Sequence, residues 1–458
     1  MVMFSKHFKS VATHIKKKFF SCGQFRLFTG QSKKRTYFTG GYASQAMSGR
    51  SKKTFRFSDY DCIGFDLDNT VARYKVGAMM EMEYEILAHY MVRKGYSEKH
   101  LLKPVEQDFL LKGLIVDNDN GNILKIADDG KILVATHGTK ILSDEKIQEY
   151  YPNFHWEPTD LFAKDPLHTW NGPYSEKMRT LLDYFDVVAS LVYARAVDSI
   201  DEEEGKPKTN YTIWPDLLEA LQQMFHRDHF QQEKGIYFSK MKSNPDKYYY
   251  KNSDNLINWF KLLKENNKLL FLITGAYVDF AALTASTTLG PNWRDYFDIV
   301  VTYAKKPGFF TQGRDFIGVD GFKETGVISL EQLQIGGIYT HGNWDVLHKF
   351  LSIHSRNPNP KFVYIGDNLI QDIYTPSVYS HCDTVAVCEE LQAEGLSGHD
   401  SKHPDTHFLK SSVWGSYFHH KNYSTNWYQI LKDHSNFCFP SLEYISKFPL
   451  EYKHKCMF

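Results

Sequence analysis

The chain has 458 residues, of which 42% are hydrophobic and 24% charged, the composition of a globular protein long enough for more than one domain. Its formal charge is zero, but residues 1–58 contain 13 Lys or Arg and no Asp or Glu, so the rest has 41 basic against 54 acidic residues. A body with a balance of −13 is unsuited to binding nucleic acid through a general basic surface. No apolar stretch is long and uninterrupted enough to span a membrane.

Residues 1–57 form a basic leader distinct from the rest of the chain. Its first part places apolar residues at near-helical spacing between lysines: Phe4, Phe8, Val11, Ile15 and Phe19. An amphipathic, hydroxyl-rich and acid-free segment is typical of a mitochondrial transit peptide, so we expect mitochondrial import. Three alternatives stay open: a disordered basic tail on a cytoplasmic protein, an upstream extension absent from the working protein, or a nuclear signal formed by basic clusters such as Lys33-Lys34-Arg35.

The first motif follows an apolar run, residues 61–65, that predicts a buried strand. Asp66, Asp68 and Thr70 come next, at alternate positions beyond the carboxyl end of that strand. In open α/β sheets this end is where ligands bind. Two neighbouring carboxylates are costly to hold together unless a cation or a charged ligand compensates them. The stretch therefore predicts a ligand site, with Asp66 as a nucleophile.

A mixed insertion is predicted between the first motif and residue 252. Helical periodicity begins near Met80 and ends near Gly95. Short apolar runs at 114–116, 123–126 and 132–134, separated by Asp- and Gly-containing turns, predict an antiparallel meander. The remainder is mostly helical, and its clearest helices are expected at 178–200 and 215–230. We therefore expect residues 76–252 to form a mixed α+β cap.

From Ser253 onward, helical segments alternate with apolar strands at 269–273, 299–301, 362–365 and 383–387. Fully apolar strands that alternate with helices favour a parallel sheet with helices on both faces. The predicted fold class is α/β: a Rossmann-like core made of residues 58–75 and 253–390. Residues 391–458 are expected to form a C-terminal extension that packs on or near this core.

Polar residues follow three further strands of the predicted sheet. Thr274 and Gly275 come after the second strand, Lys306 after the third, and Asp367 after the fourth, with Asp372 five residues on. Because parallel strands end at one edge of a sheet, these groups should lie in one crevice with the first motif.

Such a set suits phosphoryl transfer. Asp66 would attack phosphorus and form an acylphosphate, while Asp68 would protonate the leaving oxygen and later deprotonate water. The phosphate oxygens would be held by three residues, Thr274, Gly275 and Lys306.

A magnesium ion is the expected cofactor. Mg²⁺ prefers a few carboxylate and carbonyl oxygens, and Asp66, Asp367 and a backbone carbonyl at Asp68 could supply them. Asp372 and Thr70 are expected in supporting roles at the same site.

The combination of these motifs resembles the haloacid dehalogenase-like phosphatases. More narrowly, it is similar to the cytosolic purine 5'-nucleotidase family and its 5'-nucleotidase domain-containing proteins, on Gly64 to Thr70, His137-Gly138, Lys306 to Phe310, and Tyr364 to Asp367 with Asp372. The resemblance runs from about residue 58 to at least residue 390. It implies Mg²⁺-dependent hydrolysis of nucleoside 5'-monophosphates through a phospho-aspartyl intermediate, with a cap inserted after the first motif.

Two points depart from, or go beyond, this resemblance. The active nucleotidases have Thr-x-Ser in the second motif, whereas this chain has Ala276 at the third position and so lacks one phosphate donor. The alternatives are therefore a phosphatase for another small phosphate ester, or a catalytically weak nucleotide-binding protein. A homo-oligomer is left open. We considered contacts with the base for four cap residues but expect a surface pair and core aromatics instead: Arg195 and Asp198, and Trp214 and Phe225.

Overall fold

The computed structural model describes residues 54–171 and 173–455. The predicted transit peptide lies outside these residues, apart from the last few positions of the leader. Within the described ranges, no helix is both long and apolar enough to cross a membrane.

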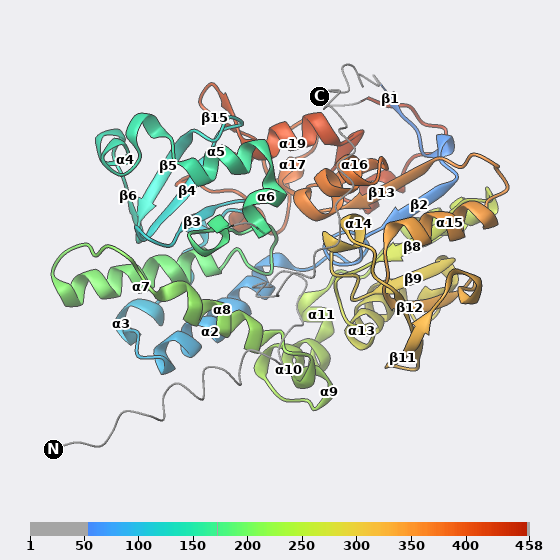
Figure 1. Ribbon diagram of the computed structural model, residues 1–458, viewed down its shortest axis with the longest axis horizontal. Helices are drawn as coiled ribbons and strands as arrows, with labels where there is room; N and C mark the ends of the chain where they lie inside the picture. The colour runs from blue at the N-terminus through green and yellow to red at the C-terminus, as the bar shows by residue number, and fades with distance from the viewer. Residues whose placement is uncertain (1–53, 172, 456–458) are drawn as a thin grey trace, which may run out of the picture.

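A nine-stranded sheet forms the centre of the larger half of the molecule, at the right of Figure 1. Its edge hairpin, β11 (Lys323–Ile328) and β10 (Phe316–Asp320), is antiparallel to the neighbouring strand. The other strands are all parallel, in the order β12 (Gly337–His341), β9 (Ile299–Thr302), β8 (Leu269–Ile273), β2 (Cys62–Phe65), β13 (Phe362–Gly366), β14 (Asp383–Val387) and β17 (Phe437–Phe439). This confirms the strands expected at 269–273, 299–301, 362–365 and 383–387.

Both faces of this sheet are buried beneath helices. Successive side chains of a strand point to opposite faces, so Ile63 and Phe65 of β2 belong to one hydrophobic cluster and Cys62 to another. The first cluster includes α12 (Asp254–Glu265) and α13 (Val278–Leu289), and the second includes α14 (Gly308–Thr311) and α15 (Trp344–His354). The α/β class predicted from the strand pattern is confirmed.

The cap, at the left of Figure 1, combines helices with a five-stranded antiparallel sheet. The strand order is β6 (Lys140–Ile141), β5 (Ile132–His137), β4 (Asn122–Ile126), β3 (Ile115–Asp117) and β7 (Met178–Thr180), which confirms the predicted meander. The main helices of the cap are α2 (Val76–Arg93), α7 (Ala189–Glu204), α8 (Ile213–Met224), α9 (Arg227–Gln231) and α10 (Ile236–Ser243), and the last three contribute residues to the site.

Two predicted cap helices are wrong in their extent. Residues 178–180 do not begin a helix: they form the edge strand β7, which pairs with β3, and α7 starts only at Ala189. The helix expected at 215–230 is divided into α8 and α9. The break lies at Phe225 and His226, because the His226 ring accepts a hydrogen bond from the Asp228 amide (3.2 Å) and starts a new helix.

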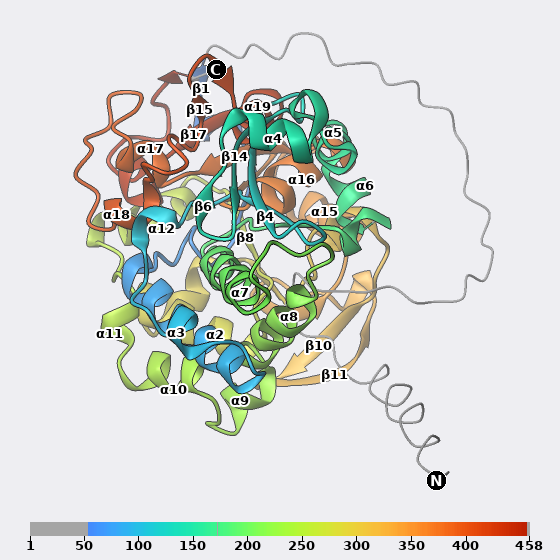
Figure 2. The same ribbon diagram turned by 90° about the vertical axis from the view of Figure 1, so that its left-hand side faces the viewer.

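The segment after residue 390 lies in two places. Its last strand, β17, extends the main sheet beyond the predicted core range. Residues near α19 (Asn426–His434) pack instead on the cap, where the Trp427 indole donates to the Gly113 carbonyl (3.0 Å) and the Trp414 indole to the Phe109 carbonyl (2.8 Å). Figure 2 shows this red segment beside the cap sheet. Gly113 is required there, since a Cβ would lie 2.1 Å from the Trp427 Nε1.

The remaining α-helices and strands are short: β1 (Thr54–Phe55), α3 (Glu98–Leu101), α4 (Asp144–Tyr150), α5 (Glu157–Lys164), α6 (Pro166–Asn171), α11 (Pro245–Tyr248), α16 (Thr375–Tyr379), α17 (Glu390–Ala393), α18 (Thr406–Leu409), β15 (His419–His420), β16 (Tyr423–Ser424), α20 (Leu442–Ile445) and β18 (His454–Lys455).

Candidate active site

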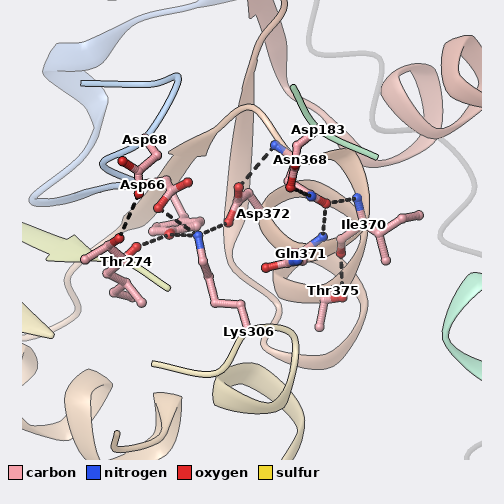
Figure 3. Close-up of polar contacts among 12 residues, drawn as sticks. Asp66, Asp68, Asp183, Thr274, Lys306, Asn368, Ile370, Gln371, Asp372 and Thr375 are labelled. Atoms are coloured by element: carbon pink, nitrogen blue, oxygen red, sulfur yellow. Dashed lines mark hydrogen bonds and ion pairs between the residues drawn. The ribbon is translucent and has the colours of Figure 1, made fainter. Parts of the chain in front are cut away.

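A cavity lies between the core and the cap, at the carboxyl ends of the parallel strands. From the core it is lined by six of the residues predicted from strand ends, Asp66, Asp68, Gly275, Lys306, Asp367 and Asp372. Figure 3 shows how most of these side chains, together with Thr274, converge although they come from distant parts of the chain. Thr70 is different: it is buried, and its hydroxyl has no hydrogen-bond partner among the described residues.

Asp66 is the first residue after β2 and is held by the neighbouring strand. Its amide donates to the Ile365 carbonyl of β13 (2.8 Å), so its carboxylate projects from a fixed backbone. The Lys306 Nζ lies 2.9 Å from Asp66 Oδ1 and donates to Asp372 Oδ1 at 2.6 Å. Burial alone would lower the pKa of Lys306, but the carboxylates of Asp372 and Asp66 outweigh it and raise that pKa. Lys306 is therefore a permanent cation beside Asp66.

Asp68 has two hydroxyl donors. The Tyr74 hydroxyl donates to Oδ1 at 2.7 Å, and the Thr274 hydroxyl donates to Oδ2 at 3.4 Å. Burial and the nearby charge of Asp66 raise the pKa of Asp68 to about 7, although both hydrogen bonds oppose the rise. A carboxyl with this pKa can both give and take a proton near neutral pH. No sequence signal marked Tyr74 as its partner.

Three buried carboxylates lie close enough to share a cation. Asp66, Asp367 and Asp372 each place an oxygen within 4.8 Å of the other two. Burial, and then the charges of Asp66 and Asp372, raise the pKa of Asp367 well above its usual range, although Lys112 opposes this. Asp367 Oδ2 is buried without a hydrogen-bond donor in the described part of the chain. A set of oxygen ligands with an unpaired buried acceptor fits a hard divalent cation.

The cap side of the cavity is aromatic and acidic, and most of its residues were not predicted from the sequence. Its rings are Phe185, Phe225, Phe230, Tyr237 and Phe238 from the cap, with Tyr277 and Phe280 from the core. Asp183, Asp186 and Arg227 also line it. The Asn368 side-chain amide donates to Asp183 Oδ2 at 3.5 Å and so connects the cap with the residue after Asp367. Burial and the charge of Asp183 raise the pKa of Asp186 well above its usual range.

Of the four cap residues considered for base contacts, only Phe225 lines the cavity. Arg195 is structural: it donates to the Tyr84 hydroxyl and to two backbone carbonyls (2.8 and 2.9 Å). Asp198 accepts hydrogen bonds from the turn after β5, and Trp214 is buried in the hydrophobic core of the cap. Hydrophobic periodicity does not distinguish a residue that lines a pocket from one on the surface or in the core. The sequence alone therefore could not show which of these four residues faces the cavity.

Comparison with known proteins shows the family of the chain. It matches the sequence profile of the 5' nucleotidase family over residues 51–442. The chain belongs to this family. It is 32% identical over 431 residues to the human protein named 5'-nucleotidase domain-containing protein 1, which covers 87% of this chain and 92% of the human one. The Bos taurus protein of the same name is 32% identical over 426 residues, with 87% and 92% coverage.

Membership of the 5' nucleotidase family confirms the resemblance drawn from the strand-end motifs. It also implies the reaction class, hydrolysis of a phosphoric monoester. The matched range includes the first motif, the whole cap and the strands that end at Thr274, Lys306 and Asp367.

Proposed function

We propose that the protein is a Mg²⁺-dependent 5'-nucleotidase with a haloacid dehalogenase-like core, which hydrolyses nucleoside 5'-monophosphates to nucleoside and phosphate. The observation that supports this best is the pair Asp66 and Asp68 at the end of β2. One carboxylate lies beside the cation Lys306, and the other has a pKa of about 7. A nucleophile and an acid/base in one cavity are the two groups that a covalent phosphatase needs.

In the first step, a carboxylate oxygen of Asp66 attacks phosphorus in line with the 5' oxygen. The new bond joins phosphorus to Asp66, the bond from phosphorus to the 5' oxygen breaks, and protonated Asp68 gives its proton to that oxygen. Lys306 and the amides near Gly275 bind the non-bridging oxygens. Their positive charge and dipoles stabilise the charge that develops on the phosphoryl group.

In the second step, Asp68 takes a proton from water, and the water oxygen attacks phosphorus. The bond between phosphorus and Asp66 breaks, which releases inorganic phosphate and regenerates the carboxylate. One group serves as acid and then as base because its pKa of about 7 leaves both forms populated at neutral pH. Tyr74 and Thr274 orient it through the hydrogen bonds to its two oxygens.

The side chains of Asp66, Asp367 and Asp372 would hold the magnesium ion, with the backbone carbonyl of Asp68 as a further ligand. Three observations support such a site: the three carboxylates lie close together, the pKa of Asp367 is raised, and Asp367 Oδ2 has no hydrogen-bond partner among the described residues. When bound, Mg²⁺ neutralises charge between these carboxylates and the phosphate dianion.

The cap side of the cavity supports a nucleoside as the leaving group. Aromatic rings offer stacking faces to a planar base, which are worth about 1–3 kcal/mol per base in other base-binding sites. Asp183 and Asp186 can accept hydrogen bonds from sugar hydroxyls or base amino groups. Ala276, in place of a hydroxyl residue, favours one alternative, a protein that binds nucleotide and turns over poorly.

A substrate panel with and without Mg²⁺ tests the proposal. Purified protein should release phosphate from nucleoside 5'-monophosphates faster than from sugar phosphates, and chelation should abolish the release. Preference for another phosphate ester would instead establish the alternative of a phosphatase for that ester. Nucleotide binding without phosphate release from any ester would establish the weak binder instead.

A further inference from the structure

The cavity has few positive charges for a site that binds a phosphate dianion. Seven carboxylates among the described residues line it, and Lys306 and Arg227 are its cations. Lys306 is already paired with Asp66 and Asp372 at 2.9 and 2.6 Å. The second motif provides no hydroxyl at Ala276. A second cation directed at the phosphate would therefore supply both the missing positive charge and the hydrogen-bond donor that Ala276 does not provide.

Arg227, the first residue of α9, lies against the phosphate-binding turn. Its guanidinium carbon is 4.3 Å from the centre of the Tyr277 ring, and Tyr277 directly follows Ala276. The Tyr277 ring in turn stacks on Tyr303 at 4.2 Å, in the loop that leads to Lys306. The cap thus places a flat cation on a pair of rings that connects the two phosphate-binding segments of the core.

The guanidinium has unused hydrogen-bonding capacity. Nη2 donates to the Phe322 carbonyl at 3.3 Å, and the guanidinium forms ion pairs with Asp279 and Glu324 at 3.9 and 3.8 Å, distances too long for hydrogen bonds. Nε is buried and has no hydrogen-bond partner among the described residues. A buried N–H without an acceptor is costly, so a ligand oxygen at this position would be stabilised.

We propose that Arg227 binds the phosphoryl group of the substrate from the cap side and supplies the donor that Ala276 lacks. This inference rests on the proposed hydrolysis of a phosphate ester. Asp279 positions the arginine through the ion pair with Nε (3.9 Å). The same carboxylate accepts a hydrogen bond from Gln231 of α9 (3.0 Å) and so fixes that helix to the start of α13. Planar N–H groups match phosphate oxygens in a bidentate manner, which an ammonium group does not.

Binding of inorganic phosphate tests the proposal without any leaving group. Titration of phosphate into the Mg²⁺-loaded protein should show affinity reduced at least tenfold in Arg227→Ala and by less in Arg227→Lys. Arg294→Ala is the matched control: Arg294 also lies over an aromatic ring, that of Trp293 at 5.7 Å, but outside the cavity, and its loss should leave the affinity unchanged.

Kinetics provide the second measurement. Arg227→Ala should lower kcat/KM for a nucleoside monophosphate and for p-nitrophenyl phosphate by a similar factor, on the order of 10², as for loss of one oxyanion donor elsewhere. Adding Ala276→Ser to Arg227→Ala should recover at least tenfold, whereas Ala276→Ser alone should change little.

Two results would overturn the proposal. Unchanged phosphate affinity in folded Arg227→Ala would show that Arg227 does not contact the phosphate. A loss of kcat/KM confined to the nucleotide would show that Arg227 contacts the leaving group instead. If the wild type hydrolyses no ester, the proposed function fails, yet phosphate titration of the same variants still decides the role of Arg227. Circular dichroism establishes folding, and Arg227→Lys keeps the test valid if the alanine variant does not fold.

Discussion

Tyr74→Phe removes one hydrogen bond to Asp68 and keeps the ring. The deleted hydroxyl donates to Asp68 Oδ1 at 2.7 Å, while the Tyr74 ring packs on Tyr249 at 4.7 Å and on Phe185 at 5.3 Å. Because phenylalanine preserves this packing, we expect the variant to fold with a nearly unchanged melting temperature.

The hydrogen bond favours the ionised form of Asp68, so its loss must raise the pKa of that carboxyl further. A hydrogen bond to a charged group is worth about 1.5–3 kcal/mol. The Thr274 hydroxyl still donates to the other oxygen of Asp68, so we take the lower end of that range, and one pKa unit corresponds to about 1.4 kcal/mol. The pKa should therefore rise by about one unit from its value of about 7.

The assay is the pH dependence of kcat under saturating substrate. Asp68 acts as a base only when ionised, so the acid limb of the profile should move to higher pH by about one unit in Tyr74→Phe. At pH 7 the second step should slow about fivefold. Tyr60→Phe is the control, since it deletes an equivalent bond, to Asp383 Oδ2 at 2.8 Å, outside the cavity. Superimposed profiles for Tyr74→Phe and the wild type would refute the reasoning.

Three further predictions concern the phosphate site, the core and the leader. Lys306→Met removes the cation beside the nucleophile, and kcat/KM should fall by at least about 10²-fold in a protein that circular dichroism shows to be folded. Gly64→Ala places a Cβ 2.1 Å from the Phe271 ring, so the free energy of unfolding in urea should fall by about 1–3 kcal/mol, whereas Gly326→Ala, with open space around it, should be neutral. We also propose mitochondrial import: a reporter fused to residues 1–58 should enter mitochondria, and a cytosolic reporter would refute this.

The strand-end residues of the site were predictable because their placement follows from local patterns. An apolar run followed by Asp66 or Asp367 marks the end of a buried strand, and the geometry of a parallel sheet brings such ends together. The same rule placed Gly275 and Lys306 in the cavity. No knowledge of the cap was needed for that part of the prediction.

The cap side of the site could not be predicted in the same way. Arg227 lies where a helix pattern is interrupted, and only the hydrogen bond from Asp228 to the His226 ring shows that a new helix begins there. Tyr74 reaches Asp68 through a turn with no periodicity of its own. Such contacts depend on how two halves of the chain pack, which local hydrophobic patterns do not encode.

The C-terminal segment shows the same limit over a longer range. Trp414 and Trp427 pack under the cap, about 300 residues from their partners Phe109 and Gly113. Their indole N–H groups find backbone carbonyls there, as buried indoles generally must. Nothing in the polar, weakly periodic sequence after residue 390 indicates which half of the molecule it covers.

The central claim is covalent catalysis by Asp66, and a single acid-quench experiment tests it most directly. Asp68→Asn removes the base of the second step, and p-nitrophenolate leaves in the first step without needing a proton. p-Nitrophenyl phosphate mixed with excess Mg²⁺-loaded variant should therefore leave a phosphoryl group on the protein. Peptide mass spectrometry should locate a hydroxylamine-sensitive phosphoryl group on Asp66, and it should disappear in Asp66→Asn. Phosphate release by Asp66→Asn at the wild-type rate, or a phosphoryl group on another residue, would contradict the account.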